Sequence, residues 1–180
     1  LAITDLHGIA TLTRDRIRLR EATANANGGT LVVNGAIDYP NLELTGGTIT
    51  IAGRGLAFEI PEHLRTEVDT DLVLTLSETI SLLSGRGTIL RGSYREPISL
   101  TRQLLATGVD GASPLPAESS PGFIDRIRLG LSVTSDQDIF VDNNYGRLEA
   151  GSNLRITGTI GQPVLAGRLT VQEGGEVFLG

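Results

Sequence analysis

The 180-residue chain contains no cysteine, methionine, tryptophan or lysine, and its aromatic residues are limited to four phenylalanines and three tyrosines. Without cysteine, the chain forms no disulfide and no thiolate metal or redox site. The two histidines, His7 and His63, lie far apart, and neither belongs to a pair with metal-ligand spacing. No Gly-x-Ser-x-Gly motif is present to hold a nucleophile. We therefore expect a protein that is not an enzyme and that holds no cofactor and no metal.

Charge and hydropathy exclude two further classes of function. All 15 basic residues are arginines, and 21 acidic residues outnumber them to give a net charge of −6. Nucleic-acid binding requires a concentrated positive surface, and the sequence has no basic cluster, so we expect no nucleic-acid partner. No window of 18 apolar residues occurs, so no segment of this sequence is apolar for long enough to cross a membrane as a helix.

The densest acidic cluster consists of Asp136, Asp138 and Asp142, followed by Asn143 and Asn144. Oxygen ligands of this kind are the ones that calcium prefers. The spacing does not match an EF-hand loop, however, and Asp and Asn are ordinary residues of the turns that connect strands. We predict a turn here and no metal site.

The chain does contain a repeated pentapeptide. Asp-Arg-Ile-Arg-Leu occupies residues 15–19 and returns unchanged at residues 125–129. Each copy opens a run of period two, in which isoleucines and leucines point one way and arginines or small residues point the other way. Such alternation is typical of a strand with one apolar face and one solvated face. Its recurrence predicts a long sheet built from similar pieces.

Arginines occupy the solvated side of these runs, as Arg16, Arg18 and Arg20 in the first copy and as Arg126 and Arg128 in the second. Their ordinary roles in such positions are solvation and protection of sheet edges. Contact with lipid headgroups is the alternative.

Residues 1–96 read as successive strands separated by Gly, Asn and Pro. The pair Leu42 and Leu44 predicts one of these strands, and the pair Ile49 and Ile51 predicts the next with the opposite parity. A one-residue slip would invert the faces, so we expect a bulge or a tight turn at the intervening Gly46-Gly47.

Residues 97–122 interrupt the strands. The leucine spacing after Pro97 predicts one short helix over residues 97–106. Residues 108–122 are rich in Pro, Gly and Ser and predict a long loop. Strands resume at residue 123; we expect a long one that Pro163 ends and a turn at Gly174-Gly175.

One apolar stripe on every strand leaves a face that must be covered. A β-helix would cover it by stacking short strands at a steady period of about 20–25 residues, but the spacing here is irregular. A sheet that curls lengthwise around its apolar face fits better, so we predict an all-β, elongated curled sheet with an apolar inner groove. Aliphatic side chains contact hydrocarbon without orienting a polar substrate, and such a groove therefore suits acyl chains. The residues predicted to line it are Leu31, Val33, Ile37, Leu42, Leu44, Ile49, Ile51, Leu72, Leu74, Leu76, Ile127, Leu129, Leu131, Val133, Leu148, Leu154, Ile156, Leu165, Leu169 and Val171.

The last part of the chain resembles a known family. The run Leu154–Ile160, then Pro163, then Leu165–Leu169, then Glu173–Phe178, is similar to the C-terminal region of the TamB family, which is related to the AsmA-like proteins. The resemblance is strongest over residues 123–180. The segment 15–37 is similar to family units further upstream, and residues 97–122 look individual to this protein.

The resemblance implies a fold, a location and partners. The fold would be a β-taco, with residues 1–180 forming a single segment of a longer protein that an N-terminal helix, not in this sequence, anchors in the inner membrane. This segment would lie in the periplasm and meet an outer-membrane protein of the Omp85 type, similar to TamA. Family members are linked to phospholipid transport between the membranes and to assembly of autotransporter-type outer-membrane proteins.

Three hypotheses about function follow from pattern and resemblance together. The first is a bridge whose groove carries phospholipid acyl chains between the two membranes and so supports outer-membrane homeostasis. The second is a chaperone-like template that pairs with nascent outer-membrane β-barrel and autotransporter proteins. The third is a secreted β-helix adhesin, prompted by the segment Gly28–Gly35.

Overall fold

The computed structural model describes residues 3–59, 64–95, 126–144 and 146–177, and these residues form one large curved sheet. Among them the only helical segment of more than one residue is the 3-10 turn Pro40–Leu42. In chain order the strands are β1 (Ile3–Leu12), β2 (Arg16–Ala26), β3 (Gly29–Asp38), β4 (Gly46–Glu59), β5 (Leu64–Ser77), β6 (Ser81–Tyr94), β7 (Ile127–Asn143), β8 (Gly146–Gly158), β9 (Pro163–Val171) and β10 (Glu176–Val177). The predicted all-β curled sheet is confirmed.

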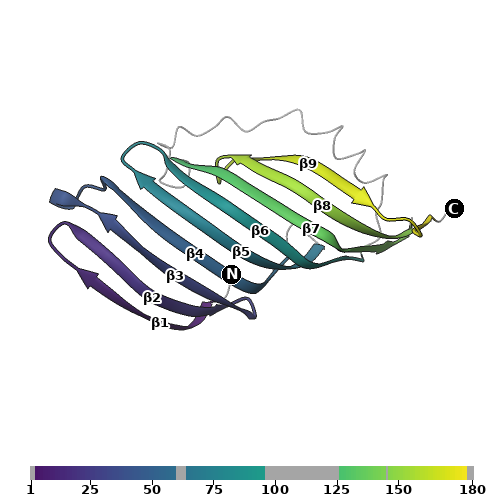
Figure 1. Cartoon of the computed structure of the whole chain (residues 1–180), viewed down its shortest axis with the longest axis horizontal. Coiled ribbons are helices and arrows are strands. Elements are labelled where there is room, and N and C mark those ends of the chain that lie inside the picture. Colours follow the sequence, from purple (N-terminus) through teal and green to yellow (C-terminus); the bar gives the residue numbers. More distant parts are fainter. Residues whose placement is uncertain (1–2, 60–63, 96–125, 145, 178–180) are drawn as a thin grey trace, which may run out of the picture.

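Strands that follow each other in the chain also lie side by side in the sheet, from β1 at one end to β9 at the other (Figure 1). Neighbours are antiparallel except for β6 and β7, which run parallel. The last two strands both pair with β8. Strands β2 and β7 begin within the two copies of the pentapeptide, at Arg16 and Ile127, where the alternation predicted strands.

The residue types in the connecting turns explain where the hairpins form. Asn27 and Gly28 join β2 to β3 with φ of 48° and 84°. Asn-Gly is the favoured pair for a two-residue hairpin because both positions need a positive φ. The expected turn near Gly174 is also present, between β9 and β10.

The expectation of a strand at Leu42 and Leu44 was wrong. Leu42 and Leu44 belong to no strand: Asn41 and Leu42 have positive φ of 55° and 68°, which an extended chain cannot accommodate. Leu42 is 86% exposed there. The parity change at Gly46-Gly47 is explained by this 3-10 turn and the loop after it, because β4 simply begins at Gly46 with its own register.

The long strand near the C-terminus does not run to Pro163. Strand β8 ends at Gly158, whose φ is 85°, and Thr159 and Gln162 close the turn with hydrogen bonds between their backbones. Pro163 is instead the first residue of β9, a position where the lack of an N–H is tolerated. The helix predicted over 97–106 and the loop predicted over 108–122 lie outside the described residues.

The described part of the sheet is a single layer with two different faces. Its elements make substantial contact only with their neighbours in the sheet. The buried alanines, leucines, isoleucines and serines all lie on one face of the sheet. We call this face the apolar face and the opposite face the polar face. The buried residues are Ala22, Ala24, Ala26, Leu56, Leu76, Ser81, Ile89, Ile127, Ser135, Ala150 and Ser152. Since no described element covers the apolar face, its side chains are shielded by one another, as expected where a sheet curves toward that face.

Candidate functional site: the apolar face of the sheet

The strand register gathers the predicted aliphatic residues on the apolar face. Residues directly opposite each other in a ladder point to the same side, so the pairing partners define the face. One row crosses seven strands through Val33, Ile51, Leu72, Gly85, Leu131, Ile156 and Leu165. With neighbouring strands about 4.8 Å apart, this row spans about 29 Å from β3 to β9.

Of the residues predicted to line a groove, all except Leu42 and Leu44 occupy this face. The two exceptions lie in the 3-10 turn and the loop that follows it. Leu148 joins the set from the far part of β8, where it lies opposite Val141. That these residues bind a lipid remains a prediction.

The apolar face carries no charge over most of its length. Among the described side chains of β3 to β9, no arginine, aspartate, glutamate or histidine occupies a position on this face. Most aliphatic residues there are half-buried, and none of the large side chains is fully enclosed. The face is therefore an uncharged, largely hydrocarbon surface that remains partly open to solvent.

A pair of serines interrupts this surface. Ser135 and Ser152 lie directly opposite each other on β7 and β8, and both are buried. Neither Oγ atom has a hydrogen-bond partner in the described structure. Nothing in the local sequence pattern indicated that Ser135 would face Ser152.

Two glycines on the apolar face have no room for a side chain against the neighbouring strand. A Cβ atom at Gly85 would lie 2.2 Å from the carbonyl oxygen of Asp71 and 2.8 Å from the Cα of Leu72. Gly167 shows the same relation to the neighbouring Leu154, whose Cα would lie 2.7 Å from an added Cβ. Both glycines have positive φ, 142° and 152°. An isolated glycine inside a strand pattern is the sequence signal for such a close backbone approach.

Bulges bend the strands while keeping apolar residues on the same face. In β2 the register shifts between Leu19 and Ala22, and Glu21 has a φ of 48°. The Glu21 N–H donates to Oδ1 of Asn34 on β3 at 2.7 Å. In β4 the Gly55 N–H donates in the same way to Oδ1 of Asp69 on β5 at 2.8 Å. In both bulges, therefore, a backbone N–H of the bulged strand donates a hydrogen bond to a side chain of the next strand. Bulges of this kind increase the local twist of the sheet.

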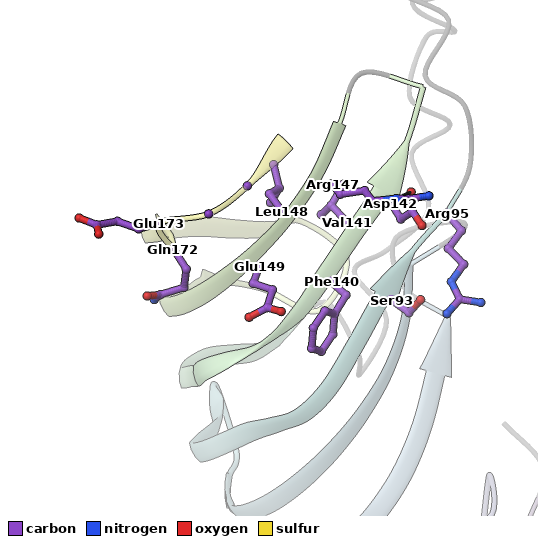
Figure 2. Close-up of a pocket in the computed structure, with 12 residues that line it drawn as sticks. Ser93, Arg95, Phe140, Val141, Asp142, Arg147, Leu148, Glu149, Gln172 and Glu173 are labelled. Carbon is purple, nitrogen blue, oxygen red and sulfur yellow. Dashed lines mark hydrogen bonds and ion pairs between the residues drawn. The ribbon is translucent and has the colours of Figure 1, made fainter. Parts of the chain in front are cut away.

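The C-terminal end of the sheet is different in character. A hollow of about 400 Å³ there is lined by Phe140, Leu148, Glu149 and Arg147, among others. Figure 2 shows Phe140 and Glu149 extending to one side of their strands and Leu148 to the other. Arg147 is bound to Asp142 within this hollow, with Nε 3.0 Å from Oδ1. Hydrocarbon and ionic groups therefore meet in this hollow.

Comparison with known protein families decides the identity of the fold. The family described as TamB C-terminal domain matches residues 19–180. The chain belongs to the TamB family. The resemblance seen in residues 123–180 therefore extends over nearly all of the sheet, including the strands before residue 96. No curated protein and no solved structure matches the chain.

Membership of the TamB family places the chain among proteins of the translocation and assembly module, which belong to the cell envelope and work in general with TamA-type partners. Within the described residues no helix is long and apolar enough to cross a membrane. No group of three or more histidine, aspartate or glutamate side chains in the same residues is arranged to hold a metal ion.

The polar face of this TamB domain carries its ion pairs. Arg16 binds Asp38, and Arg54 binds Asp71 with 2.7 Å between Nη2 and Oδ1. The hydrogen bond from Arg16 lowers the pKa of Asp38, and the same bond raises the pKa of Arg16. Hydrogen bonds to their carboxylate partners likewise raise the pKa values of Arg54 and Arg147. All these groups are exposed, so the pairs contribute little to stability.

Proposed function

We propose that the apolar face carries phospholipid acyl chains, as one segment of a periplasmic bridge between the inner and outer membranes that supports outer-membrane homeostasis. The observation that carries this proposal is the uncharged aliphatic row that crosses β3 to β9. Its occupant would be hydrocarbon, and its outer-membrane partner a TamA-like protein of the Omp85 type.

The physical reason is the match between the surface and an acyl chain. Each methylene group removed from water contributes about 0.8 kcal/mol, and a chain lying along the row meets an aliphatic side chain at every strand except β6, where the row passes Gly85. Because no described side chain on this part of the face is charged, a bound chain can shift from one strand to the next without passing an ion. The aliphatic groups do not fix the orientation of the chain, which suits transfer better than storage.

Native mass spectrometry with lipid extraction tests the proposal on the chain purified from a Gram-negative host. The test variants are Leu74→Asp on β5 and Ile156→Asp on β8, which place a charge on the apolar face. Thr75→Asp and Thr157→Asp are matched controls, because each adds the same charge one residue away, on the polar face. We expect co-purified phospholipid in the wild type and both controls, and its loss in the two test variants.

Circular dichroism melts accompany the comparison, since a charge on a half-buried face also costs stability. Folded test variants that retain as much phospholipid as the wild type would contradict the proposal. A wild-type chain that carries no lipid from the host would contradict it as well.

A second candidate function is a template for nascent outer-membrane β-barrel and autotransporter proteins. The observation that favours it is the exposed strand β9, which pairs with β8 on one side and with no described strand on the other. Such an edge offers unpaired backbone groups for strand addition. Photo-crosslinking from Ala166 and Thr170 to nascent clients would support a template, and absence of crosslinks at both positions would count against it. The third hypothesis, a β-helix adhesin, does not fit a sheet whose neighbours are nearly all antiparallel.

A further inference from the structure

Four arginines gather on the polar face at the C-terminal half of the sheet. They are Arg86 on β6, Arg128 on β7, Arg155 on β8 and Arg168 on β9, and all four are exposed. The register places Ser132 directly between Arg86 and Arg155. Arg168 lies one strand further, opposite Asn153. We call these four residues the arginine patch.

The patch differs from the four ion-paired arginines of the sheet in having no carboxylate partner; within the described residues Arg18, Arg20 and Arg91 form no ion pair either. Arg16, Arg54, Arg65 and Arg147 each form an ion pair. None of the four patch arginines forms an ion pair or a side-chain hydrogen bond within the described part of the chain. Asp71 lies opposite Arg86 in the register, but its carboxylate is bound to Arg54.

Among the described side chains of β6 to β9, the polar-face positions around the patch carry no negative charge, whereas Asp71 on the adjacent β5 lies opposite Arg86. In the stretches of β6 to β9 that hold the patch, the other positions on this face are Leu82, Ser84, Thr88, Gly130, Ser132, Thr134, Gly151, Asn153, Thr157, Val164, Ala166 and Thr170. Hydroxyl and amide groups dominate this set. On these stretches of β6 to β9, the described side chains of a protein of net charge −6 thus carry only positive charges, and Asp71, which is bound to Arg54, borders them on β5.

A shallow hollow of about 280 Å³ lies within this surface, lined by Arg168, Asn153, Thr134 and Thr170, among others. A guanidinium, an amide and two hydroxyl groups together offer hydrogen-bond donors, and hydrogen bonds from a guanidinium to phosphate oxygens are among the stronger ones in proteins. The hollow is therefore suited to a phosphate group.

We propose that the arginine patch docks the sheet onto the surface of a membrane that contains anionic phospholipids. Basic residues are attracted to such a surface individually, and four of them act together on adjacent strands. This docking goes beyond the transport proposed above and does not depend on the apolar face holding lipid.

The form of the patch favours a membrane over an acidic protein. Its arginines are spread over four neighbouring strands, about 14 Å from β6 to β9, so that they face many headgroups and do not converge on one acidic group. Two exposed aliphatic side chains, Leu82 and Val164, share the same surface. Apolar groups beside cations are typical of protein surfaces that lie on the headgroup layer.

Vesicle co-sedimentation of the 180-residue chain tests the proposal. The vesicles are phosphatidylcholine alone or phosphatidylcholine mixed with phosphatidylglycerol. The test variant replaces Arg86, Arg128, Arg155 and Arg168 with Gln, and its matched control replaces the four ion-paired arginines, Arg16, Arg54, Arg65 and Arg147, with Gln. Both variants change the net charge equally, so any difference between them comes from the position of the charges.

We expect the wild type and the control to bind the anionic vesicles, with binding weakened by salt because counterions screen exposed charges. The patch variant should bind at least roughly tenfold more weakly, since each basic residue near an anionic surface contributes about fivefold. None of the three proteins should bind vesicles of phosphatidylcholine alone. Melting curves establish that the variants are folded.

Equal loss of binding in the two variants, or equal retention in both, overturns the proposal. Binding of the wild type to polyglutamate but not to anionic vesicles overturns it in favour of an acidic protein partner. The variant Ile156→Asp separates this docking from lipid transport. If Ile156→Asp loses co-purified lipid but still binds anionic vesicles, the result supports the arginine patch as the docking surface. If this variant also loses vesicle binding, the apolar face is what binds the vesicles, and the proposal for the patch is overturned.

Discussion

Ser135 and Ser152 face each other across β7 and β8 on the apolar face, and neither hydroxyl has a hydrogen-bond partner in the described structure. Both residues are at least nine-tenths buried, with exposures of 7% and 6%. A buried polar group without a partner costs about 1–3 kcal/mol, so this pair is a local weakness in an otherwise aliphatic surface.

Replacing both serines with alanine should therefore stabilise the chain. We expect the double variant Ser135→Ala/Ser152→Ala to raise the free energy of unfolding by about 1 kcal/mol or more, because it removes two unsatisfied hydroxyls from a buried site. Urea denaturation measures the change. The control is Ser132→Ala on the same strand, whose Oγ donates to the carbonyl oxygen of Gly85 at 3.4 Å. That variant should leave stability unchanged or lower it slightly; an unstable double variant would show that the hydroxyls are satisfied in solution.

Gly85 is expected to tolerate no side chain. In Gly85→Ala the new Cβ would meet the backbone of Asp71 and Leu72 at 2.2 and 2.8 Å, and φ is 142°. Backbone atoms cannot move aside cheaply, so the free energy of unfolding should fall by about 2 kcal/mol or more. Gly130→Ala is the matched control, because a Cβ there meets only side chains, the nearest at 3.7 Å. It should change stability by less than about 1 kcal/mol, and equal effects in the two variants would contradict the close-approach explanation.

The sequence predicted the two faces well, because successive side chains of a strand point to opposite sides of the sheet. This alternation alone decides the side on which a residue lies. Leu72, Leu74 and Leu76 were expected on the same face, and their partners in β4 and β6 place them there. That inference needs only the local backbone geometry of an extended chain.

The same reasoning failed where the backbone leaves the extended region. The alternation of Leu42 and Leu44 carries no sign of the positive φ at Asn41 and Leu42. Bulges such as the one at Glu21 were also missed, because the side chain that holds the bulge, Asn34, comes from another strand. The pairing of β6 with β7 was equally beyond local patterns, since it joins residues about 45 positions apart in the chain.

The bulge in β2 should depend on Asn34. Its Oδ1 accepts the N–H of Glu21 at 2.7 Å, and Asn34→Ala would leave that donor without its partner. We expect the free energy of unfolding to fall by about 1 kcal/mol, as measured by urea denaturation. Asn34→Asp keeps an acceptor oxygen and should retain most of the stability. Asn153→Ala, at an exposed polar-face position of β8, is the control; a loss as large as that of Asn34→Ala would show that the bulge hydrogen bond is unimportant.

Acid should remove the contribution of the ion pair between Arg16 and Asp38. The hydrogen bond from Arg16 lowers the pKa of Asp38 below its ordinary value of 3.8 in the folded chain. The folded chain thus binds a proton at Asp38 less readily than the unfolded chain does. The stabilisation is complete above the unfolded pKa and disappears as the pH falls through the lower, folded value.

The comparison of wild type with Asp38→Asn should show this directly. At neutral pH the wild type should have the higher urea midpoint, by a small margin because both side chains are partly exposed. The margin should stay constant down to about pH 5 and shrink as the pH falls below the ordinary pKa of 3.8. Arg16→Gln should lose the same margin at neutral pH, since it removes the other half of the pair. A margin that persists undiminished at pH 2 would contradict the assignment of the effect to the Asp38 carboxylate.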